Sequence, residues 1–252
     1  GISQYTTQLH AAGLQVMLKP QIWVKGGVFT GEIAMRTETD WKLFEAQYHH
    51  FMINFARVAE ANQVALLCIG TELKKFVAAR PQFWKALIKE IRSVYSGKLT
   101  YAANWDSYQA VHFWEDLDYI GIDAYFPLDT VETPAINTLK EAWQKWLPQM
   151  ESLANQTQKP ILFTEYGYRS VHHNTTEPWQ STWNKGALNL TAQVNAYEAL
   201  FQSVWDKEWF GGGFVWKWFL KHDNAGGLDD NRFTPQNKPA EAVMRKYYLL
   251  YK

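Results

Sequence analysis

Apolar segments of two kinds alternate along the chain. Short runs that are apolar at consecutive positions, such as Val64–Leu73, alternate with longer segments whose apolar residues recur every three or four positions. Continuous apolar runs are typical of parallel strands covered on both faces, and the second spacing predicts the covering helices. The predicted strands are Leu14–Pro20, Val64–Leu73, Leu99–Ala103, Leu117–Tyr125, Pro160–Glu165 and Gly211–Trp218.

The predicted helices are bounded by residues that commonly start or end helices. Gly13 suits the end of a first short helix, Asp40 is a candidate N-cap, and Pro81 is placed to open a helix. The predicted helices are Ile2–Ala12, Asp40–Asn62, Pro81–Tyr95, Pro134–Ala154, Leu190–Trp205 and Pro239–Leu249, with a short helical piece at Tyr108–Trp114.

Strict alternation of strand and helix predicts a parallel α/β fold with right-handed crossovers. The first strand lacks the glycine-rich turn of a dinucleotide-binding fold, and functional-looking residues end nearly every strand, as in a (β/α)8 TIM barrel. No linker-like stretch divides residues 1–252, so we expect one catalytic barrel domain. Because the chain begins on a helix, we expect strands 1 and 2 of the eight to lie upstream of Gly1.

Two predicted strands end in the same dipeptide. Thr71-Glu72 closes one and Thr164-Glu165 closes another. Barrel folds place their chemistry at the carboxyl ends of the strands, so the pair predicts an active site with two carboxylates. The alternative for each glutamate is a helix cap or an ion pair.

Charge and composition exclude several classes of function. The 25 basic and 25 acidic side chains balance, which argues against a broad nucleic-acid surface, and no apolar run reaches the length of a membrane span. Cys68, the only cysteine, is expected to be a buried thiol.

Metal chemistry has little support in the sequence. The adjacent histidine pairs at positions 49–50 and 172–173 lack the spacing of a metal site, and for Asp229-Asp230-Asn231 a solvated loop is favoured over a calcium loop. We therefore expect neither a metal nor a cofactor.

The 13 tryptophans are the unusual part of the composition. An indole offers a flat apolar face, and sugar rings stack on such faces, so the abundance favours a carbohydrate ligand. Packing in the core and between helices is the alternative for most of them.

Seven motifs along the chain together resemble glycoside hydrolase family 113. The resemblance implies a β-mannan-cleaving enzyme on a (β/α)8 barrel, with its two catalytic glutamates on strands 4 and 7. It makes Val64–Leu73 strand 4 and Pro160–Glu165 strand 7. The motifs are Leu18–Pro20, Ile69–Glu72, Leu99–Asp106, Asp118–Pro127, Phe163–Gly167, Phe214–Trp218 and Thr234–Ala240.

The resemblance also implies a role for each carboxylate. Glu72 becomes the acid/base of a retaining double displacement, and Glu165 becomes the nucleophile. Glu165 has to remain ionised, which a tyrosine hydroxyl would favour, and Tyr125 is the candidate donor. Packing alone is the alternative for Tyr125.

Sugar-binding residues are expected around these carboxylates. Trp218 or Trp216 is the candidate floor under the cleaved sugar; strand alternation lets only one face inward, and we favour Trp218. Lys19 and Asn104 are candidates for hydrogen bonds to sugar hydroxyls, with a structural bond to a loop carbonyl as the alternative. Further candidate platforms are Trp23, Trp105, Trp179 and Trp183.

Two rival functions remain at this point. One is a retaining barrel glycosidase for another β-linked glycan, and the other is a carbohydrate-binding barrel without turnover. The main hypothesis is cleavage of β-1,4-linked mannan or glucomannan, with the oligosaccharide as the only partner, no nucleic acid or membrane, and a monomeric enzyme. Polymer substrates are usually met outside the cytoplasm, so we expect a secreted, periplasmic or cell-surface location.

Overall fold

Six strands follow one another in chain order along one sheet. The computed structural model describes residues 1–181 and 186–250. The pairs β1–β2, β2–β3 and β5–β6 are parallel, as the sequence predicts. The strands are β1 (Met17–Leu18), β2 (Leu66–Thr71), β3 (Lys98–Asn104), β4 (Ile120–Asp123), β5 (Ile161–Tyr166) and β6 (Phe210–Val215).

The chain divides into two compact units. The first comprises Gly1–Ile122 with Thr157–Pro160, and the second comprises Asp123–Gln156 with Ile161–Lys252. Each unit contains its own aromatic core. The expectation of one domain over the whole chain stays a prediction.

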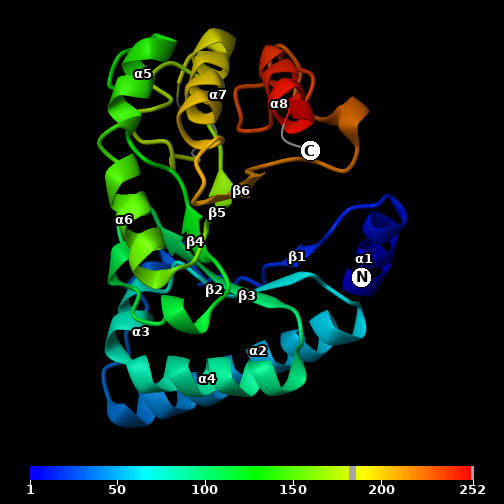
Figure 1. Ribbon diagram of the computed structural model, residues 1–252, viewed down its shortest axis with the longest axis vertical. Helices are drawn as coiled ribbons and strands as arrows, with labels where there is room; N and C mark the ends of the chain where they lie inside the picture. Colours follow the sequence, from blue (N-terminus) through cyan, green and yellow to red (C-terminus); the bar gives the residue numbers. More distant parts are fainter. Residues whose placement is uncertain (182–185, 251–252) are drawn as a thin grey trace. The chain divides into compact units, whose positions relative to one another are not determined.

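In the first unit, helices α2 and α4 lie side by side (Figure 1). The rings of Tyr48, Phe76 and Trp84 pack edge to face or tilted between them, with centroids 5.1 to 5.5 Å apart. All three are buried, so aromatic packing forms this core. The helices of this unit are α1 (Ile2–Ala11), α2 (Glu38–Ala61), α3 (Lys74–Ala79) and α4 (Pro81–Val94), with 3-10 turns η1 (Thr30–Glu32), η2 (Tyr108–Ala110) and η3 (Trp114–Asp116).

In the second unit, helix α7 packs against both α5 and α8 (Figure 1). Phe201 on α7 stacks on Tyr247 of α8, with ring centroids 4.7 Å apart, and also contacts Tyr166 of β5 edge to face. The helices here are α5 (Ile136–Trp143), α6 (Leu147–Thr157), α7 (Leu190–Val204) and α8 (Pro239–Leu250), with the 3-10 turn η4 (His222–Asn224). No helix in the described ranges of either unit is long and apolar enough to cross a membrane.

Two helix boundaries differ from the prediction. Helix α2 begins at Glu38 and not at Asp40, because Thr37 is the N-cap and its hydroxyl accepts from the Asp40 amide at 3.1 Å. The predicted helix Pro134–Ala154 is two helices, α5 and α6. Pro148 has no N–H to donate backwards and its ring crowds the preceding turn, which explains the break before α6. The short helix α3 was not predicted.

Candidate active site

The end of β2 is fixed by aromatic side chains that pack directly on its main chain. A Cβ on Gly70 would lie 2.8 Å from Tyr48 Oη and 2.9 Å from Tyr101 Cε2, so only glycine allows these rings to come so close. The Tyr48 hydroxyl also donates to the Ile69 carbonyl at 2.8 Å. These contacts set the position at which the chain reaches Glu72.

Glu72 itself has a left-handed backbone conformation, with φ of 52°. Its N–H donates to the Ala102 carbonyl at 2.8 Å, and the N–H of Leu73 donates to Tyr101 Oη at 2.7 Å. A non-glycine residue in this region costs on the order of 1 kcal/mol, and such residues cluster at functional sites. The half-buried Glu72 side chain therefore leaves the strand end in a direction that two hydrogen bonds enforce.

The other candidates of the first unit lie at strand ends or in a loop. Asn104 is the last residue of β3, and its Oδ1 accepts from the Trp105 amide at 3.0 Å. Lys19 directly follows β1 and is half-buried, as is Trp105. Trp23 lies in the loop after β1 with 86% of its surface exposed.

Glu165 lies near the end of β5 and is half-buried. The Tyr125 hydroxyl donates to Glu165 Oε2 at 2.9 Å, so the donor expected from the sequence contacts this carboxylate. The Ala124 N–H donates to the Glu165 carbonyl at 2.7 Å, which fixes Tyr125 beside it. Tyr125 is buried, and its ring packs edge to face on Phe233.

The threonines that precede the two glutamates have different surroundings. Thr164 is buried, and its hydroxyl donates to Asp123 Oδ1 at 2.7 Å. The buried hydroxyl of Thr71 has no hydrogen-bond partner within the described residues. The threonine hydroxyl of the dipeptide therefore binds a carboxylate at β5, whereas at β2 it has no hydrogen-bond partner among the described residues.

Trp216 and Trp218 lie beyond the end of β6, so strand alternation does not decide between them. The strand stops at Val215, and a cis peptide joins Trp216 to Lys217. Trp216 is half-buried beneath the Lys217 ammonium, 5.4 Å from its ring, whereas Trp218 is 47% exposed. The indole of Trp218 thus offers the larger open face for a ligand.

Gly167 allows β5 and the segment after β6 to touch. The Trp216 N–H donates to the Tyr166 carbonyl at 2.7 Å, and a Cβ on Gly167 would lie 2.2 Å from the Trp216 carbonyl oxygen. Any larger residue would force the two main chains apart. Of the remaining platform candidates, Trp179 is 39% exposed, and Trp183 lies outside the described residues.

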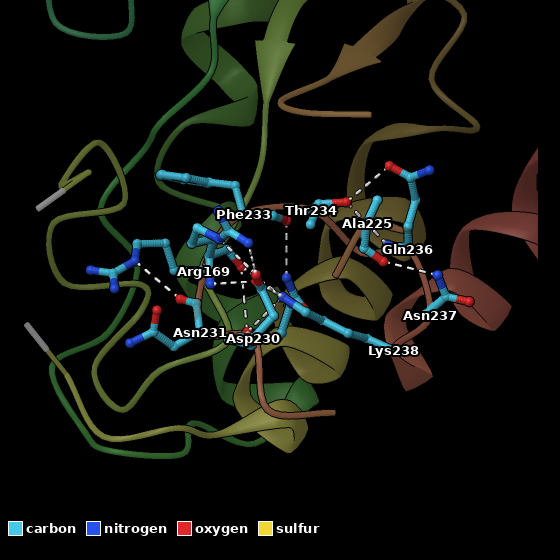
Figure 2. Close-up of polar contacts among 12 residues, drawn as sticks. Arg169, Ala225, Asp230, Asn231, Phe233, Thr234, Gln236, Asn237 and Lys238 are labelled. Atoms are coloured by element: carbon cyan, nitrogen blue, oxygen red, sulfur yellow. Dashed lines mark hydrogen bonds and ion pairs between the residues drawn. The ribbon is translucent and has the colours of Figure 1, made fainter. Parts of the chain in front are cut away.

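A buried polar cluster holds the loop that follows β5 (Figure 2). The ammonium of Lys238 donates to Ser170 Oγ at 2.9 Å, to Asp230 Oδ1 at 2.8 Å and to the Arg232 carbonyl at 2.9 Å. The Lys238 side chain is 0% exposed and that of Asp230 is 7% exposed. The loop Asp229-Asp230-Asn231, expected to be solvated, is therefore partly buried. The Asp230 carboxylate is paired with the Lys238 ammonium.

Arg169 belongs to the same cluster. Its Nε donates to the Asn231 carbonyl at 3.2 Å, and its buried Nη2 lacks a partner within the described residues (Figure 2). No role for Arg169 or Lys238 was predicted from the sequence. A lysine one residue before a helix-opening proline looks exposed in the sequence, and only the tertiary structure buries it.

The charges of this cluster depend on both burial and pairing. Burial lowers the pKa of Lys238 below its ordinary value, although the Asp230 carboxylate opposes that shift. Burial alone would raise the pKa of Asp230, but hydrogen bonds from Lys238 and Arg232 outweigh it and lower the pKa below 3.8. Burial also lowers the pKa of the Arg169 guanidinium, with Asp230 again opposing. No group of three or more metal-ligating side chains occurs within residues 1–181 and 186–250.

Comparison with known proteins places this fold and these strand ends in a family. The model of glycoside hydrolase family 113 matches residues 1–238. A GH113 β-mannanase from Alicyclobacillus acidocaldarius, solved in complex with ManMIm, has a TM-score of 0.86 and 28% identity, over 99% of this chain and 77% of that one. A GH113 β-1,4-mannanase solved as a complex has a TM-score of 0.84 and 25% identity, over 98% and 78%.

A more distant likeness concerns the fold alone. A β-glucuronidase from Ruminococcus gnavus has a TM-score of 0.66 and 15% identity, over 97% of this chain and 41% of that one. No curated protein is similar in sequence to the chain. The predicted fold class, with the strand–helix alternation of a (β/α)8 barrel, is confirmed by the match to the GH113 structures.

Proposed function

The chain belongs to glycoside hydrolase family 113, and on that premise we propose that it cleaves β-1,4-linked mannan or glucomannan with retention at the anomeric carbon. The substrate follows from the β-mannanases that its fold resembles. The observation that carries the mechanism is the hydrogen bond from the Tyr125 hydroxyl to Glu165 at the end of β5. A hydroxyl donor stabilises an ionised carboxylate, which is the form that a nucleophile needs.

In the first step, Glu165 attacks the anomeric carbon while Glu72 gives its proton to the departing glycosidic oxygen. The bond from the anomeric carbon to that oxygen breaks, and an ester to Glu165 forms. Tyr125 is the donor to the carboxylate that becomes this ester. The mechanism needs the two carboxyl groups about 5–5.5 Å apart, the spacing of retaining enzymes.

In the second step, Glu72 acts as a base. It removes a proton from water, the water oxygen attacks the anomeric carbon, and the ester to Glu165 breaks. Two inversions give net retention, and both glutamates return to their starting states. The backbone conformation of Glu72, fixed by Ala102 and Tyr101, supports this role because general acid/base catalysis requires a well-defined carboxyl direction.

The substrate contacts follow from the exposed aromatic and polar candidates. Trp218 forms the floor under the cleaved sugar, with its exposed indole face toward the ring. Lys19 and Asn104 bind sugar hydroxyls. The indoles proposed for further subsites are Trp23, Trp105, Trp179 and Trp183, and Trp216 is the alternative floor.

The setting of the enzyme follows from the substrate. Mannan is an extracellular polymer, so the enzyme works outside the cytoplasm, secreted, periplasmic or at the cell surface. One chain supplies both glutamates, so the proposed reaction needs no residue from a second copy, and we propose a monomer.

The anomer that first appears from β-1,4-mannopentaose tests this function. Proton NMR should show β-anomeric reducing ends before mutarotation, and cellopentaose should be a poor substrate in the matched assay. An initial α-anomer would contradict the retaining mechanism, and no cleavage of mannopentaose would contradict the substrate.

Two variants connect that activity to the proposed nucleophile. Glu165→Gln should lower kcat by about 10⁴-fold or more, because the amide cannot attack the anomeric carbon. Glu151→Gln, which changes an exposed glutamate of α6, is the matched control and should retain full activity. Equal activity of the two variants would exclude Glu165 as the nucleophile.

A further inference from the structure

The segment Trp216–Phe219 has little packing to hold it. Trp218 is 47% exposed and Phe219 is 37% exposed, and the next residue, Leu220, is 74% exposed. Apolar burial therefore contributes little to the position of this part of the chain. An aromatic floor needs a defined position, so polar contacts have to supply it.

Hydrogen bonds to main-chain groups fix the position of the segment at both of its ends. At the first end, the Trp216 N–H donates to the Tyr166 carbonyl at 2.7 Å. At the second end, the Gln236 carboxamide forms hydrogen bonds with both main-chain polar groups of Phe219. The Phe219 N–H donates to Oε1 at 2.6 Å, and Nε2 donates to the Phe219 carbonyl at 2.9 Å. Trp218 lies directly between these two fixed points.

The carboxamide is itself held in one orientation. Gln236 is 0% exposed, and the Thr234 hydroxyl donates to Gln236 Oε1 at 3.1 Å while accepting from the Gln236 N–H at 3.3 Å. A flipped amide would set its NH2 group against the Phe219 N–H and the Thr234 hydroxyl proton, so the observed orientation is the one that satisfies every group. Figure 2 shows Thr234 and Gln236 side by side in this loop.

The loop that carries Gln236 is fixed as well. Gly226 lies so close that a Cβ there would come 1.8 Å from the Gln236 carbonyl oxygen, and the Gly227 N–H donates to that oxygen at 3.2 Å. Asn237 Nδ2 donates to the Ala225 carbonyl at 2.9 Å (Figure 2) and to the His222 carbonyl at 2.8 Å. Gln236 thus connects the exposed segment Trp216–Phe219 to a loop that is itself fixed by hydrogen bonds and close packing.

We propose that Gln236 is a positioning residue whose carboxamide, by binding both main-chain groups of Phe219, sets the Trp218 indole for the sugar. The inference rests on the proposed function, in which Trp218 is the floor under the cleaved sugar. Gln236 does not touch the substrate and acts through Phe219. Its loss therefore lowers activity only as far as Trp218 contributes to activity.

A double-mutant cycle on β-1,4-mannopentaose measures this dependence. Gln236→Met removes both hydrogen bonds at nearly constant volume and should lower kcat/KM roughly tenfold in the wild-type background, because displaced binding groups lose catalytic rate. In a Trp218→Ala background the same change should cost less than about twofold. Equal losses in the two backgrounds would overturn the proposal.

Gln193 provides the matched control. It is also 0% exposed, and its Nε2 donates to the carbonyls of Tyr168 and Phe233 at 2.8 and 3.1 Å. Gln193→Met should lower the melting temperature about as much as Gln236→Met. Its effect on kcat/KM should be the same with and without Trp218, because its contacts do not reach Phe219.

Amide hydrogen exchange tests the same contact without a substrate. The Phe219 N–H should exchange about tenfold faster or more in Gln236→Met than in the wild type or in Gln193→Met. Gln236→Glu, which keeps an acceptor for that N–H but loses the donor to the carbonyl, should give an intermediate rate, and it serves as the second variant if Gln236→Met does not fold. An unchanged Phe219 exchange rate would overturn the proposal. Inactivity of the wild type on mannopentaose would contradict the proposed function, and the exchange rate would then still test the contact between Gln236 and Phe219.

Discussion

The two Thr-Glu strand ends have the same sequence but make different contacts. At β5, the contacts are to the side chains of the dipeptide itself: Thr164 donates to Asp123, and Glu165 accepts from Tyr125. At β2, the contacts are to the main chain: the left-handed Glu72 donates its N–H to the Ala102 carbonyl, and the Leu73 N–H donates to Tyr101 Oη. A donor at a carboxylate favours its charged form. The proposed role of Glu165 as nucleophile rests on this contact with Tyr125, and the proposed role of Glu72 as acid/base rests on its fixed backbone direction.

The segments that follow the two strands differ as well. Beyond Glu72, helix α3 begins at Lys74, so that end is short and supported by helix and strand. Beyond β5, Ser170 lies in the segment that leads toward α7, and the buried ammonium of Lys238 contacts both Ser170 and Asp230. The β5 end is therefore the one whose stability should respond to pH.

The largest effect that distinguishes the two ends is expected from Glu72→Ala. Loss of the general acid should lower kcat/KM on mannopentaose by on the order of 10³-fold, because the departing sugar oxygen needs a proton. An aryl β-mannoside with a dinitrophenolate leaving group needs none, so its cleavage to the enzyme ester should be nearly unaffected. Steady-state and burst kinetics on both substrates measure this, and equal losses on both would remove the assigned difference between Glu72 and Glu165.

The next effect concerns the donor at Glu165. Tyr125→Phe should lower kcat roughly 10- to 100-fold with little change in folding, since the ring contact with Phe233 remains while a donor to the carboxylate is lost. Tyr168→Phe is the matched control, because the buried Tyr168 hydroxyl has no hydrogen-bond partner within the described residues. If both variants keep wild-type kcat, the Tyr125 hydrogen bond has no part in catalysis.

The buried ion pair after β5 should make stability depend on pH. The pKa of Asp230 is lowered in the folded protein, so the unfolded chain binds more protons in acid. Its contribution is then present above pH 3.8 and is lost as pH falls through the lowered folded value. Asp230→Asn should cost about 3 kcal/mol at neutral pH, because it leaves the Lys238 ammonium buried without its partner.

Urea unfolding at roughly pH 7 and pH 3.5 measures that prediction. The wild type should lose more stability between the two conditions than Asp230→Asn does. Asp229→Asn, at the neighbouring exposed aspartate, should behave like the wild type. Parallel pH profiles for all three proteins would show that the pair contributes nothing.

The smallest effect compares the two threonines directly. Thr164→Val removes the hydroxyl donor from the buried Asp123 and should cost about 1–2 kcal/mol of unfolding free energy. Thr71→Val removes a buried hydroxyl that has no partner within the described residues, so it should be close to neutral or slightly stabilising. Calorimetry on the two variants measures the difference, and equal destabilisation would mean that the strand ends are held alike.

Periodicity and caps predicted most of the fold, because parallel strands and their helices are specified locally. The six strands and the long helices lie where the apolar pattern placed them. The errors have local causes that competed with the pattern: the Thr37 cap, and Pro148 within a long amphipathic stretch. The abundance of tryptophan was ambiguous because Trp84 and Trp143 are fully buried while Trp23 and Trp218 are exposed, and composition cannot separate the two groups.

The site could be predicted only where chemistry lies at a strand end. Tyr125 and Glu165 were paired from their places on adjacent predicted strands, and the hydrogen bond between them is present. The burial of Lys238 and the hydrogen bonds between Gln236 and Phe219 depend on contacts between distant parts of the chain, which no local pattern encodes. Trp218 was preferred over Trp216 because it was expected nearer the mouth of the strand. Since β6 ends before both residues, only the exposure of Trp218 now supports that choice.

Chemical rescue of Glu165→Ala by azide tests the central claim most directly. The small side chain leaves room for azide to attack the anomeric carbon in place of the carboxylate, from the same face. With an activated β-mannoside and azide, the variant should recover activity and release the α-mannosyl azide, identified by NMR. A β-mannosyl azide from this variant, or azide rescue confined to Glu72→Ala, would contradict the assignment of Glu165 as the nucleophile.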